Sequence, residues 1–433
     1  MNASNSTCDS SSIIKTGLLT GASLLTTDRF VHAKGDDTIR IALIGCGGRG
    51  SGAAAQAMNT PGKTKLVALA DVDEGQLARS LSVLRKQQPD KVDVPVENQF
   101  LGFDSYKQAL AECDVAILAT PPGFRSIHFQ EAVQQGKHCF LEKPVATDAP
   151  GIRRVLAAAK EAKKKGLKVG VGLQRRHQSA YEETVKRIQD GAIGEITSAR
   201  CYWLGNSRDG KERLPGESEM MYQIRNWYYF TWLSGDHVVE QHIHNIDIIN
   251  WAMGGYPVKA QGMGGRQVRK QLRHGQIFDH HMVEFEYANG AKLFSQSRQI
   301  RGCAPDVSEH LTGTLGRASM ESGGKLYSIT GPGAWQSRLK ARENGHQLEH
   351  FPLFDAIRNN HEYNEAEIGA KSTMTAILGR MATYSGKMVN WDEAFASDLN
   401  LLPKEFGEYA IPPVMPDKDG WYPTAKPGKT KAW

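Results

Sequence analysis

The stretch TIRIALIGCGGRG, residues 38–50, joins an apolar run of strand length to the glycine pattern G-x-G-x-x-G. An alanine-rich segment, residues 51–58, continues as a helix, which Asn59-Thr60-Pro61-Gly62 would end. A second apolar run, residues 66–70, then leads into Asp71. Strand, glycine loop, helix, second strand and terminal acid in this order predict the first βαβ unit of a dinucleotide-binding domain.

Each part of this unit has a physical task. We expect Gly45 to permit the tight turn, Gly47 to let the backbone approach a pyrophosphate, and Gly50 to let the helix pack close to the strand. The helix N-terminus, which includes Gly48 and Arg49, would face the phosphates.

Asp71 decides between the two common dinucleotides. It follows Gly50 by 21 residues, where a carboxylate can accept both ribose hydroxyls. The same carboxylate would repel a 2′-phosphate, and Val72-Asp73 follow with no arginine close by. The sequence therefore predicts NAD as the cofactor, with NADP disfavoured.

Strands and helices keep alternating as far as residue 173, which predicts an α/β fold with a doubly wound parallel sheet. The further strands are expected at residues 114–120, 138–141 and 168–173, and the helices at 124–135 and 146–165. Ligands of such sheets sit at the carboxyl ends of the strands. We therefore expect Thr120, Pro121, Glu142 and Lys143, which stand at two of these ends, to line the cofactor site.

In part of the second half of the chain, hydrophobic residues alternate with polar ones. Residues 282–287 alternate, with Val283, Phe285 and Tyr287 on one face, and Asn289-Gly290 offers a hairpin turn before residues 292–295 return. We divide the chain into a leader at residues 1–37, a Rossmann domain at 38–173, a second α/β domain at 174–402 and a proline-rich tail at 403–433. The tail is expected to wrap the surface or a neighbouring subunit.

Composition excludes several classes of protein. The net charge is +6, but lysines and arginines are scattered among nearly as many acids, which suits a small anionic ligand and argues against nucleic acid. No apolar run approaches the roughly 18–20 residues of a membrane-spanning helix, so no membrane partner is expected.

The leader has the layout of an export signal. A short, mildly apolar stretch precedes Val31-His32-Ala33, which places small side chains as a signal peptidase requires. It resembles a twin-arginine signal in which Ser10 and Ser11 stand where the arginines would be. We expect a periplasmic protein, and a cytoplasmic one with a disordered leader is the alternative.

No metal is predicted from the sequence. There is no C-x-x-C motif of the kind that holds structural zinc. His237, Glu240, His242 and His244 are dense, but on a helix His242 and His244 would point to different faces.

Several motifs together resemble the Gfo/Idh/MocA family, which includes glucose–fructose oxidoreductase and inositol dehydrogenase. The matching stretches are GCGGRG (45–50), ALADVD (68–73), LATPP (118–122), GKHCFLEKP (136–144), VGLQRRH (171–177) and the segment 369–394. The resemblance covers about residues 38–402. It implies a Rossmann domain followed by an α/β domain with a large, mostly antiparallel sheet, whose open faces pair in a homodimer or homotetramer.

The resemblance also implies a catalytic set. In this family the lysine of E-K-P acts with an acid and a histidine, which match Lys143, Glu240 and His244, although Glu240 stands where an aspartate is usual. On one helix Glu240, His244 and Asp247 would share a face. We expect His244 to act as the base, Lys143 to stabilise negative charge on the reacting oxygen, and Glu240 to orient His244 and bind substrate.

Further residues are candidates for binding the substrate. Arginine at the domain junction can hold an acid, and aromatic rings beside polar groups can bind a sugar. The alternatives are a surface ion pair and a buried aromatic core. The candidates are Arg176, His177, Arg225, Asn226, Trp227 and Asp247.

The sequence thus predicts an NAD-dependent oxidoreductase that acts on a secondary alcohol of a sugar, inositol or glycoside. One alternative is a glycosidase that uses tightly bound NAD for a cycle of oxidation, elimination and reduction. Another is a non-catalytic NAD-binding regulatory protein.

Overall fold

The computed structural model describes residues 37–321, 326–337 and 343–432 of the 433. The leader prediction falls on residues 1–37 and so lies, apart from Asp37, outside the described residues. Residues Thr38–Trp433 form one compact unit.

The first sheet contains parallel strands in the order β3-β2-β1-β4-β5-β6, which is the Rossmann order. Its strands are β1 (Ile39–Ile44), β2 (Thr64–Asp71), β3 (Gln99–Leu101), β4 (Val115–Leu118), β5 (His138–Leu141) and β6 (Val169–Val171). Helices α1 (Gly48–Met58), α2 (Glu74–Gln87), α3 (Ser105–Ala111), α4 (Pro122–Gln134) and α5 (Ala149–Lys164) alternate with them. The predicted doubly wound α/β fold is confirmed.

Burial on both faces explains why these strands are apolar throughout. Ala42 and Ile44 of β1 belong to one hydrophobic cluster, and Ile41 and Leu43 belong to the cluster on the other face. A strand covered on both sides has no polar face to alternate with.

Two elements begin or end at other residues than predicted. The helix expected from residue 146 begins at Ala149, because the Asp148 carboxylate accepts the Gly151 N–H and caps that end. The strand expected to reach residue 120 ends at Leu118. The sequence analysis placed no element between residues 71 and 114, where α2, β3 and α3 lie.

The second sheet has the order β14-β13-β12-β11-β7-β10-β9-β8-β15. Its strands are β7 (Ile196–Gly205), β8 (Lys259–Gly265), β9 (His280–Glu286), β10 (Lys292–Gln299), β11 (Asp306–Gly313), β12 (Arg317–Glu321), β13 (Tyr327–Thr330), β14 (Trp335–Gln336) and β15 (Val389–Asn390). Its strand pairs are antiparallel apart from the parallel pair β7–β10. The predicted hairpin is β9–β10, and Val283, Phe285 and Tyr287 are buried on one face as expected.

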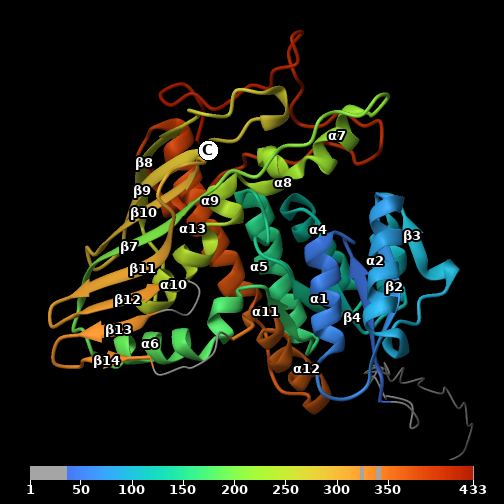
Figure 1. Ribbon diagram of the computed structural model, residues 1–433, viewed down its shortest axis with the longest axis horizontal. Coiled ribbons are helices and arrows are strands. Elements are labelled where there is room, and N and C mark those ends of the chain that lie inside the picture. The colour runs from blue at the N-terminus through green and yellow to red at the C-terminus, as the bar shows by residue number, and fades with distance from the viewer. Residues whose placement is uncertain (1–36, 322–325, 338–342, 433) are drawn as a thin grey trace, which may run out of the picture. The chain divides into compact units, whose positions relative to one another are not determined.

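Helices fill the space beside one face of this sheet. In Figure 1, α10 (Ile243–Met253) and α13 (Ala366–Ser385) lie between the second sheet and α5. Helix α13 is buried along almost its whole length, because it contacts α5 on one side and β8 and β9 on the other. Helix α12 (His350–Asn359), which also comes late in the chain, packs Leu353 and Phe354 into the core of the first sheet.

The proline-rich tail runs over the surface of its own chain, which is one of the two expected courses. Tyr422 packs edge-on against Phe230, with ring centroids 4.8 Å apart. The Gln223 side chain donates to the Val414 carbonyl at 2.7 Å. Within the part of the chain that the structure describes, no helix combines the length and the apolar character needed to cross a bilayer.

Buried histidines predict that the protein is sensitive to acid. Burial lowers the pKa of His128, His242 and His350 to about 3. Between pH 6.5 and 3 the unfolded chain binds protons that the folded chain does not, so this contribution to stability is present above pH 6.5 and is lost as the pH falls. Each such histidine removes about 1.4 kcal/mol per pH unit in that window.

We therefore expect the melting temperature to fall steeply between pH 7 and pH 5 in a scanning fluorescence measurement. A His128→Gln variant should show a shallower fall. His361→Gln, at an exposed position, is the matched control and should follow the wild type. A melting temperature independent of pH across this range would contradict the prediction.

Candidate active site

The glycine loop after β1 fits a pyrophosphate. Gly45 has φ +96°, and a Cβ there would lie 2.5 Å from the Thr120 amide nitrogen. A Cβ at Gly50 would lie 2.0 Å from the Gly45 carbonyl oxygen. In contrast, a Cβ at Gly47 or Gly48 meets no atom of the chain within 4 Å. Packing thus requires glycine at the two outer positions, and the middle of the loop borders open space at the N-terminus of α1, as an approaching pyrophosphate needs.

Asp71 ends β2 beside this loop. Its carboxylate accepts the Cys46 N–H at 2.6 Å and the Asp73 N–H at 3.0 Å. Burial raises the pKa of this carboxyl. An ionised carboxylate has about four acceptor sites, so two remain for the ribose hydroxyls of a dinucleotide.

Gly47→Ala tests where the pyrophosphate lies. The added methyl group meets no protein atom, so the melting temperature should change by less than about 2 °C. The methyl group would occupy the space of the pyrophosphate, and we expect NAD binding to weaken about 10-fold or more. Isothermal titration calorimetry measures the affinity, and Gly255→Ala, which also adds its Cβ to open space, is the control. Unchanged affinity would move the pyrophosphate away from this loop.

Asp71→Ala tests the choice of cofactor. Loss of the ribose contacts should raise KM for NAD about 10- to 100-fold, which corresponds to the loss of one or two hydrogen bonds to a charged group. KM for NADP should change less, because the carboxylate no longer repels a 2′-phosphate. Asp93→Asn, at an exposed ion pair with Lys65, is the control. Unchanged discrimination between the two cofactors would remove Asp71 from this role.

Among the other predicted cofactor residues, Arg49 at the start of α1 is paired with Glu142 at the end of β5. The Glu142 Oε1 lies 2.8 Å from the arginine Nε. The Thr120 hydroxyl lies 3.3 Å from Nδ1 of His128, and Pro121 precedes the first residue of α4. Their contacts with the cofactor stay predictions.

Lys143 and Glu240, which are 97 positions apart in the sequence, form an ion pair. The Lys143 Nζ lies 3.0 Å from Glu240 Oε1 and also donates to the Glu240 backbone carbonyl. The two side chains are 13% and 11% exposed, so the pair is shielded from water. The other carboxylate oxygen of Glu240 is buried and has no hydrogen-bond partner. This leaves one acceptor of Glu240 for a bound molecule.

His244 lies next to this pair. Its ring stacks on Trp203 with centroids 6.0 Å apart and an angle of 26° between the planes. Burial, and then the positive charge of Lys143, hold the pKa of His244 well below its usual range. The imidazole is therefore neutral around pH 7 and can accept a proton.

One helix does not carry all three predicted residues, so that expectation was wrong. Helix α9 (His237–Glu240) ends at Glu240, and α10 starts at Ile243. The break at Gln241 and His242 directs the Glu240 carboxylate to Lys143. His242 itself packs in the interior, with Nε2 at 2.7 Å from the Ser295 hydroxyl.

Most predicted substrate residues are held in ion pairs or loop contacts. Arg176 donates to both oxygens of Asp247 at 2.8 and 2.9 Å. The His177 Nε2 lies 3.3 Å from a carboxylate oxygen of Glu365.

The aromatic stretch is likewise satisfied by its own surroundings. Arg225 pairs with Glu217, and Asn226 is buried between the backbone of Lys211 and Arg273. Trp227 packs edge-on against Tyr228. The structure thus does not bring these side chains to Lys143, although they stay candidates for contacts to a large substrate.

The sequence analysis missed Gln299, which bonds to two residues close to Glu240. Gln299 on β10 donates from its amide to the Gln241 side-chain oxygen at 2.7 Å and to the Tyr228 hydroxyl at 2.6 Å. Gln241 follows Glu240 directly, and the Glu240 charge contributes to the raised pKa of Tyr228, after burial. Gln299 lies beside Gln241 only because β10 pairs with the rest of the second sheet. No motif in the neighbouring sequence predicts this position.

Comparison with known proteins gives the same assignment as the motifs. Residues 39–172 match the model described as "Oxidoreductase family, NAD-binding Rossmann fold", and residues 181–319 match the "GFO/IDH/MocA C-terminal domain". The two matches together cover more than half of the chain.

Curated relatives are similar over part of their length. Inositol 2-dehydrogenase of Agrobacterium fabrum is 30% identical over 257 residues, which are 58% of this chain and 65% of that protein. The enzyme of the same name from Ralstonia nicotianae is 27% identical over 59% of this chain and 66% of its own length. The chain thus spans just under two thirds of the length of these relatives.

Solved structures show the same fold over more of the chain. The aldose-aldose oxidoreductase of Caulobacter crescentus has a TM-score of 0.65 at 18% identity, over 82% of this chain and 99% of that one. The Rossmann order, the glycine loop and both family matches agree. The chain therefore belongs to the Gfo/Idh/MocA family of oxidoreductases, and residues 39–172 form its NAD-binding Rossmann domain.

Proposed function

We propose that the protein is an NAD-dependent dehydrogenase that oxidises a secondary alcohol of a polyol or sugar. The observation that carries this proposal is the shielded Lys143–Glu240 pair beside a neutral His244, at the end of β5 next to the glycine loop. A positive charge and a proton acceptor in one water-poor site are what the oxidation of an alcohol requires.

His244, Lys143 and Glu240 have different roles in this reaction. Bound NAD would supply the hydride acceptor. His244 takes the proton of the substrate hydroxyl, because its neutral ring is the free base of the site. The Lys143 ammonium donates a hydrogen bond to the same oxygen and stabilises the negative charge that develops there. Glu240 holds Lys143 in place and offers its unpartnered oxygen to a neighbouring hydroxyl.

The relatives and the site both favour a polyhydroxylated substrate. Two similar proteins are named inositol 2-dehydrogenase, and one from Bacillus subtilis is named scyllo-inositol 2-dehydrogenase (NAD(+)). Gln241, Gln299 and Tyr228 form a chain of amide and hydroxyl groups beside Glu240, which suits a ligand rich in hydroxyls.

The test is an initial-rate screen with NAD against myo-inositol, scyllo-inositol and common aldoses, followed by the absorbance of NADH. We expect turnover with at least one of them, and turnover that is slower by about 10³-fold or more in the Lys143→Met variant. Equal rates in wild type and variant, or no turnover by a protein that binds NAD, would contradict a dehydrogenase.

The amount of NAD that stays bound to the purified protein distinguishes the glycosidase alternative from the dehydrogenase. Protein purified without added cofactor is denatured, and the released NAD is measured by mass spectrometry. A net dehydrogenase releases little, because its NAD exchanges at each turnover. Nearly one NAD per chain, together with cleavage of a glycoside without net NADH formation, would instead favour the recycling reaction.

We further propose a homodimer or homotetramer through the open face of the second sheet. Met263, Met282, Gln296 and Tyr202 form one row across β8, β9, β10 and β7 on the face opposite the buried Val283 and Ser295. Met263 is 72% exposed. Light scattering after size-exclusion chromatography should give two or four chains, and Met263→Glu should lower that number.

The periplasmic location also stays a proposal. The leader lies outside the described residues, and its support is the layout of residues 10–33 alone. N-terminal sequencing of the protein from periplasmic extract should show a start near Lys34. An intact Met1 in the cytoplasmic fraction would contradict export.

A further inference from the structure

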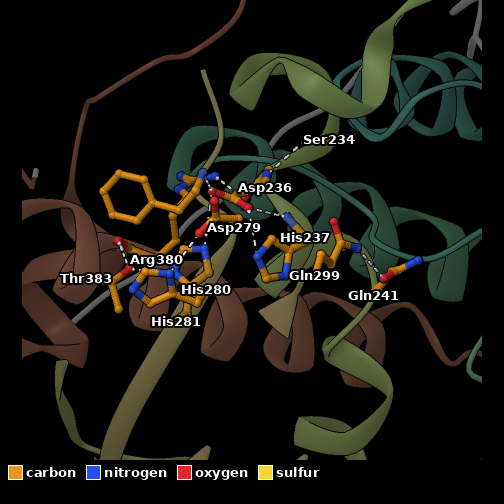
Figure 2. A network of polar contacts seen from close by, with 12 residues as sticks. Ser234, Asp236, His237, Gln241, Asp279, His280, His281, Gln299, Arg380 and Thr383 are labelled. Atoms are coloured by element: carbon orange, nitrogen blue, oxygen red, sulfur yellow. Dashed lines mark hydrogen bonds and ion pairs between the residues drawn. The ribbon is translucent and has the colours of Figure 1, made fainter. Parts of the chain in front are cut away.

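Three side chains of metal-ligating type meet in the interior, apart from the Lys143–Glu240 pair. Asp236 and His237 stand at the start of α9, and His281 lies on β9. One ligand atom from each lies within 4.8 Å of the others, and all three residues are buried. Among the described residues this is the one such group of three. Figure 2 shows both imidazoles turned toward the Asp236 carboxylate.

His281 contacts a hydroxyl on one side of its ring and the Asp236 carboxylate on the other. Its Nδ1 lies 2.9 Å from the Thr383 hydroxyl, which is also within hydrogen-bond distance of the Arg380 carbonyl. Its Nε2 lies 3.3 Å from Oδ2 of Asp236. In a neutral histidine one ring nitrogen carries the proton and the other a lone pair. The tautomer with the proton on Nδ1 directs the Nε2 lone pair toward Asp236, where a cation bound by both side chains would lie.

Asp236 is held firmly as a carboxylate. The Phe278 N–H and the Tyr384 hydroxyl donate to Oδ2, and the His237 backbone N–H donates to Oδ1. Asp236 also has φ +74°, which is a rare backbone conformation for a residue other than glycine.

His237 supplies the observation that points to a ligand. Its ring is completely buried, and neither ring nitrogen has a hydrogen-bond partner. Its Nε2 lies 3.9 Å from Oδ1 of Asp236, and its ring centroid lies 4.8 Å from that of His281. A proton on His281 would satisfy the His281–Asp236 contact but would leave His237 unpartnered. A cation bound by all three side chains would give one nitrogen of His237 a partner as well as joining His281 to Asp236.

We propose that Asp236, His237 and His281 bind one divalent first-row transition metal ion, such as Zn²⁺. Two histidines and one carboxylate are a common ligand set for these ions, and a water molecule completes the coordination. Bond lengths of about 2.0–2.2 Å place ligand atoms roughly 3.0–3.5 Å apart. The His281–Asp236 contact of 3.3 Å already fits this range, and the His237–Asp236 contact of 3.9 Å lies close to it. The widest of the three separations is within 4.8 Å, so binding would draw the side chains together by about an ångström. The Thr383 contact is the outer hydrogen bond that a metal-binding histidine usually makes.

Other charged groups surround the cluster and limit its affinity. Arg269 lies near enough to influence Asp236 and His237, and Arg380 donates to the Gly235 carbonyl just before Asp236. Asp279, the residue before β9, adds a second negative charge. Its carboxylate accepts hydrogen bonds from the backbone N–H groups of residues 267–269 and contacts the ring of His280. Arg266 also interacts with Asp236 and Asp279, so three arginines lie near two carboxylates and weaken the binding of a cation.

The metal would fix the helix that carries Glu240. Helix α9 contains His237 at its first residue and Glu240 at its last, and β9 supplies His281 from the sheet. An ion that ties α9 to β9 therefore holds Glu240 toward Lys143. This makes the three ligands positioning residues with respect to the proposed dehydrogenase reaction.

The test is metal content, which needs no substrate. The full chain is produced with a tag that does not bind metals, and its zinc, iron, manganese and cobalt are measured by plasma mass spectrometry. We expect about one ion per chain in the wild type and less than roughly a fifth of that in His237→Gln and in His281→Gln. His237→Cys, which replaces one metal ligand by another, should restore the ion.

His350→Gln is the matched control. His350 is also completely buried with both ring nitrogens unpartnered, but it has no second ligating side chain in a group of this kind within the described residues. The variant should keep the wild-type metal content. Circular dichroism shows which variants are folded, and only folded ones are compared.

Cobalt provides a second readout. Co²⁺ added to chelator-treated wild type should give intense visible absorption bands of a four- or five-coordinate site, and these bands should be absent in His281→Gln. Equal metal content in wild type, His237→Gln and His281→Gln, whether high or low, would overturn the site and leave His281 and Asp236 as a direct pair. NAD binding and polyol oxidation are measured separately, so failure of the proposed dehydrogenase activity leaves this outcome readable.

Discussion

Replacing Lys143 by methionine will lower kcat by about 10³-fold or more, the effect expected when a charge that stabilises a developing oxyanion is removed. The shielded position of Lys143 is the reason for the size of this effect, because its side chain is only 13% exposed and water cannot replace the ammonium. Steady-state kinetics with the best substrate from the screen provide the measurement. NAD binding should stay within about 3-fold of the wild type, since the glycine loop and Asp71 are untouched.

The same substitution leaves a buried carboxylate without its partner. Glu240 loses its ion pair with Lys143, which should destabilise the fold by about 1–3 kcal/mol. The double variant Lys143→Met/Glu240→Gln removes that unpaired charge and should recover much of the stability but none of the activity. Lys163→Met, at an exposed ion pair with Glu362, is the control for a lost lysine. Recovery of kcat in the double variant would show that the loss came from misfolding and not from chemistry.

Replacing His244 by glutamine will lower kcat by about 10²- to 10⁴-fold, which is the usual contribution of a general base. Glutamine keeps the approximate size of the ring and a polar end but cannot take a proton at neutral pH. His310→Gln, at a half-buried histidine on β11 that contacts Ser308 and Ser319, is the control and should keep the wild-type kcat.

The pH profile provides an independent check on His244. The base acts only when it is unprotonated, and burial followed by Lys143 holds its pKa well below 6.5. The acidic limb of kcat/KM should therefore lie below pH 6.5, so that activity is nearly constant from pH 8 down to pH 6.5. The prediction would be contradicted if kcat/KM fell with an apparent pKa of 6.5 or above and this fall were absent in His244→Gln. Such a result would mean that the ring is not buried in the free enzyme.

Much of the first domain could be predicted because its signals are local. A strand covered on both faces must be apolar throughout, and a glycine is required wherever a Cβ would collide with backbone, as at Gly45 and Gly50. The hairpin β9–β10 was also predictable, since alternation and an Asn-Gly turn are short-range features.

The features of the site that the sequence analysis did not foresee share one cause. The sequence analysis treated residues 240–247 as one helix because the spacing of the charged residues allowed it, but the chain breaks after Glu240. The break follows from contacts that are distant in sequence: Lys143 holds Glu240, and Ser295 of β10 holds His242. Arg176 and Asp247 were both candidates for the substrate, and their bond to each other was not visible in the sequence because 71 positions separate them.

The sequence by itself determined the alternation of strands and helices in the Rossmann domain and the cofactor loop, because each depends on neighbours within a few residues. It also singled out Lys143 and His244 as candidates, through motifs that resemble those of the family. Only the tertiary structure decided which polar groups meet. Lys143 meets Glu240, Gln299 meets Gln241, and His281 meets Asp236 and His237. Such pairs form when sheets and helices pack, and a buried polar group takes whichever partner the packing brings within hydrogen-bond distance.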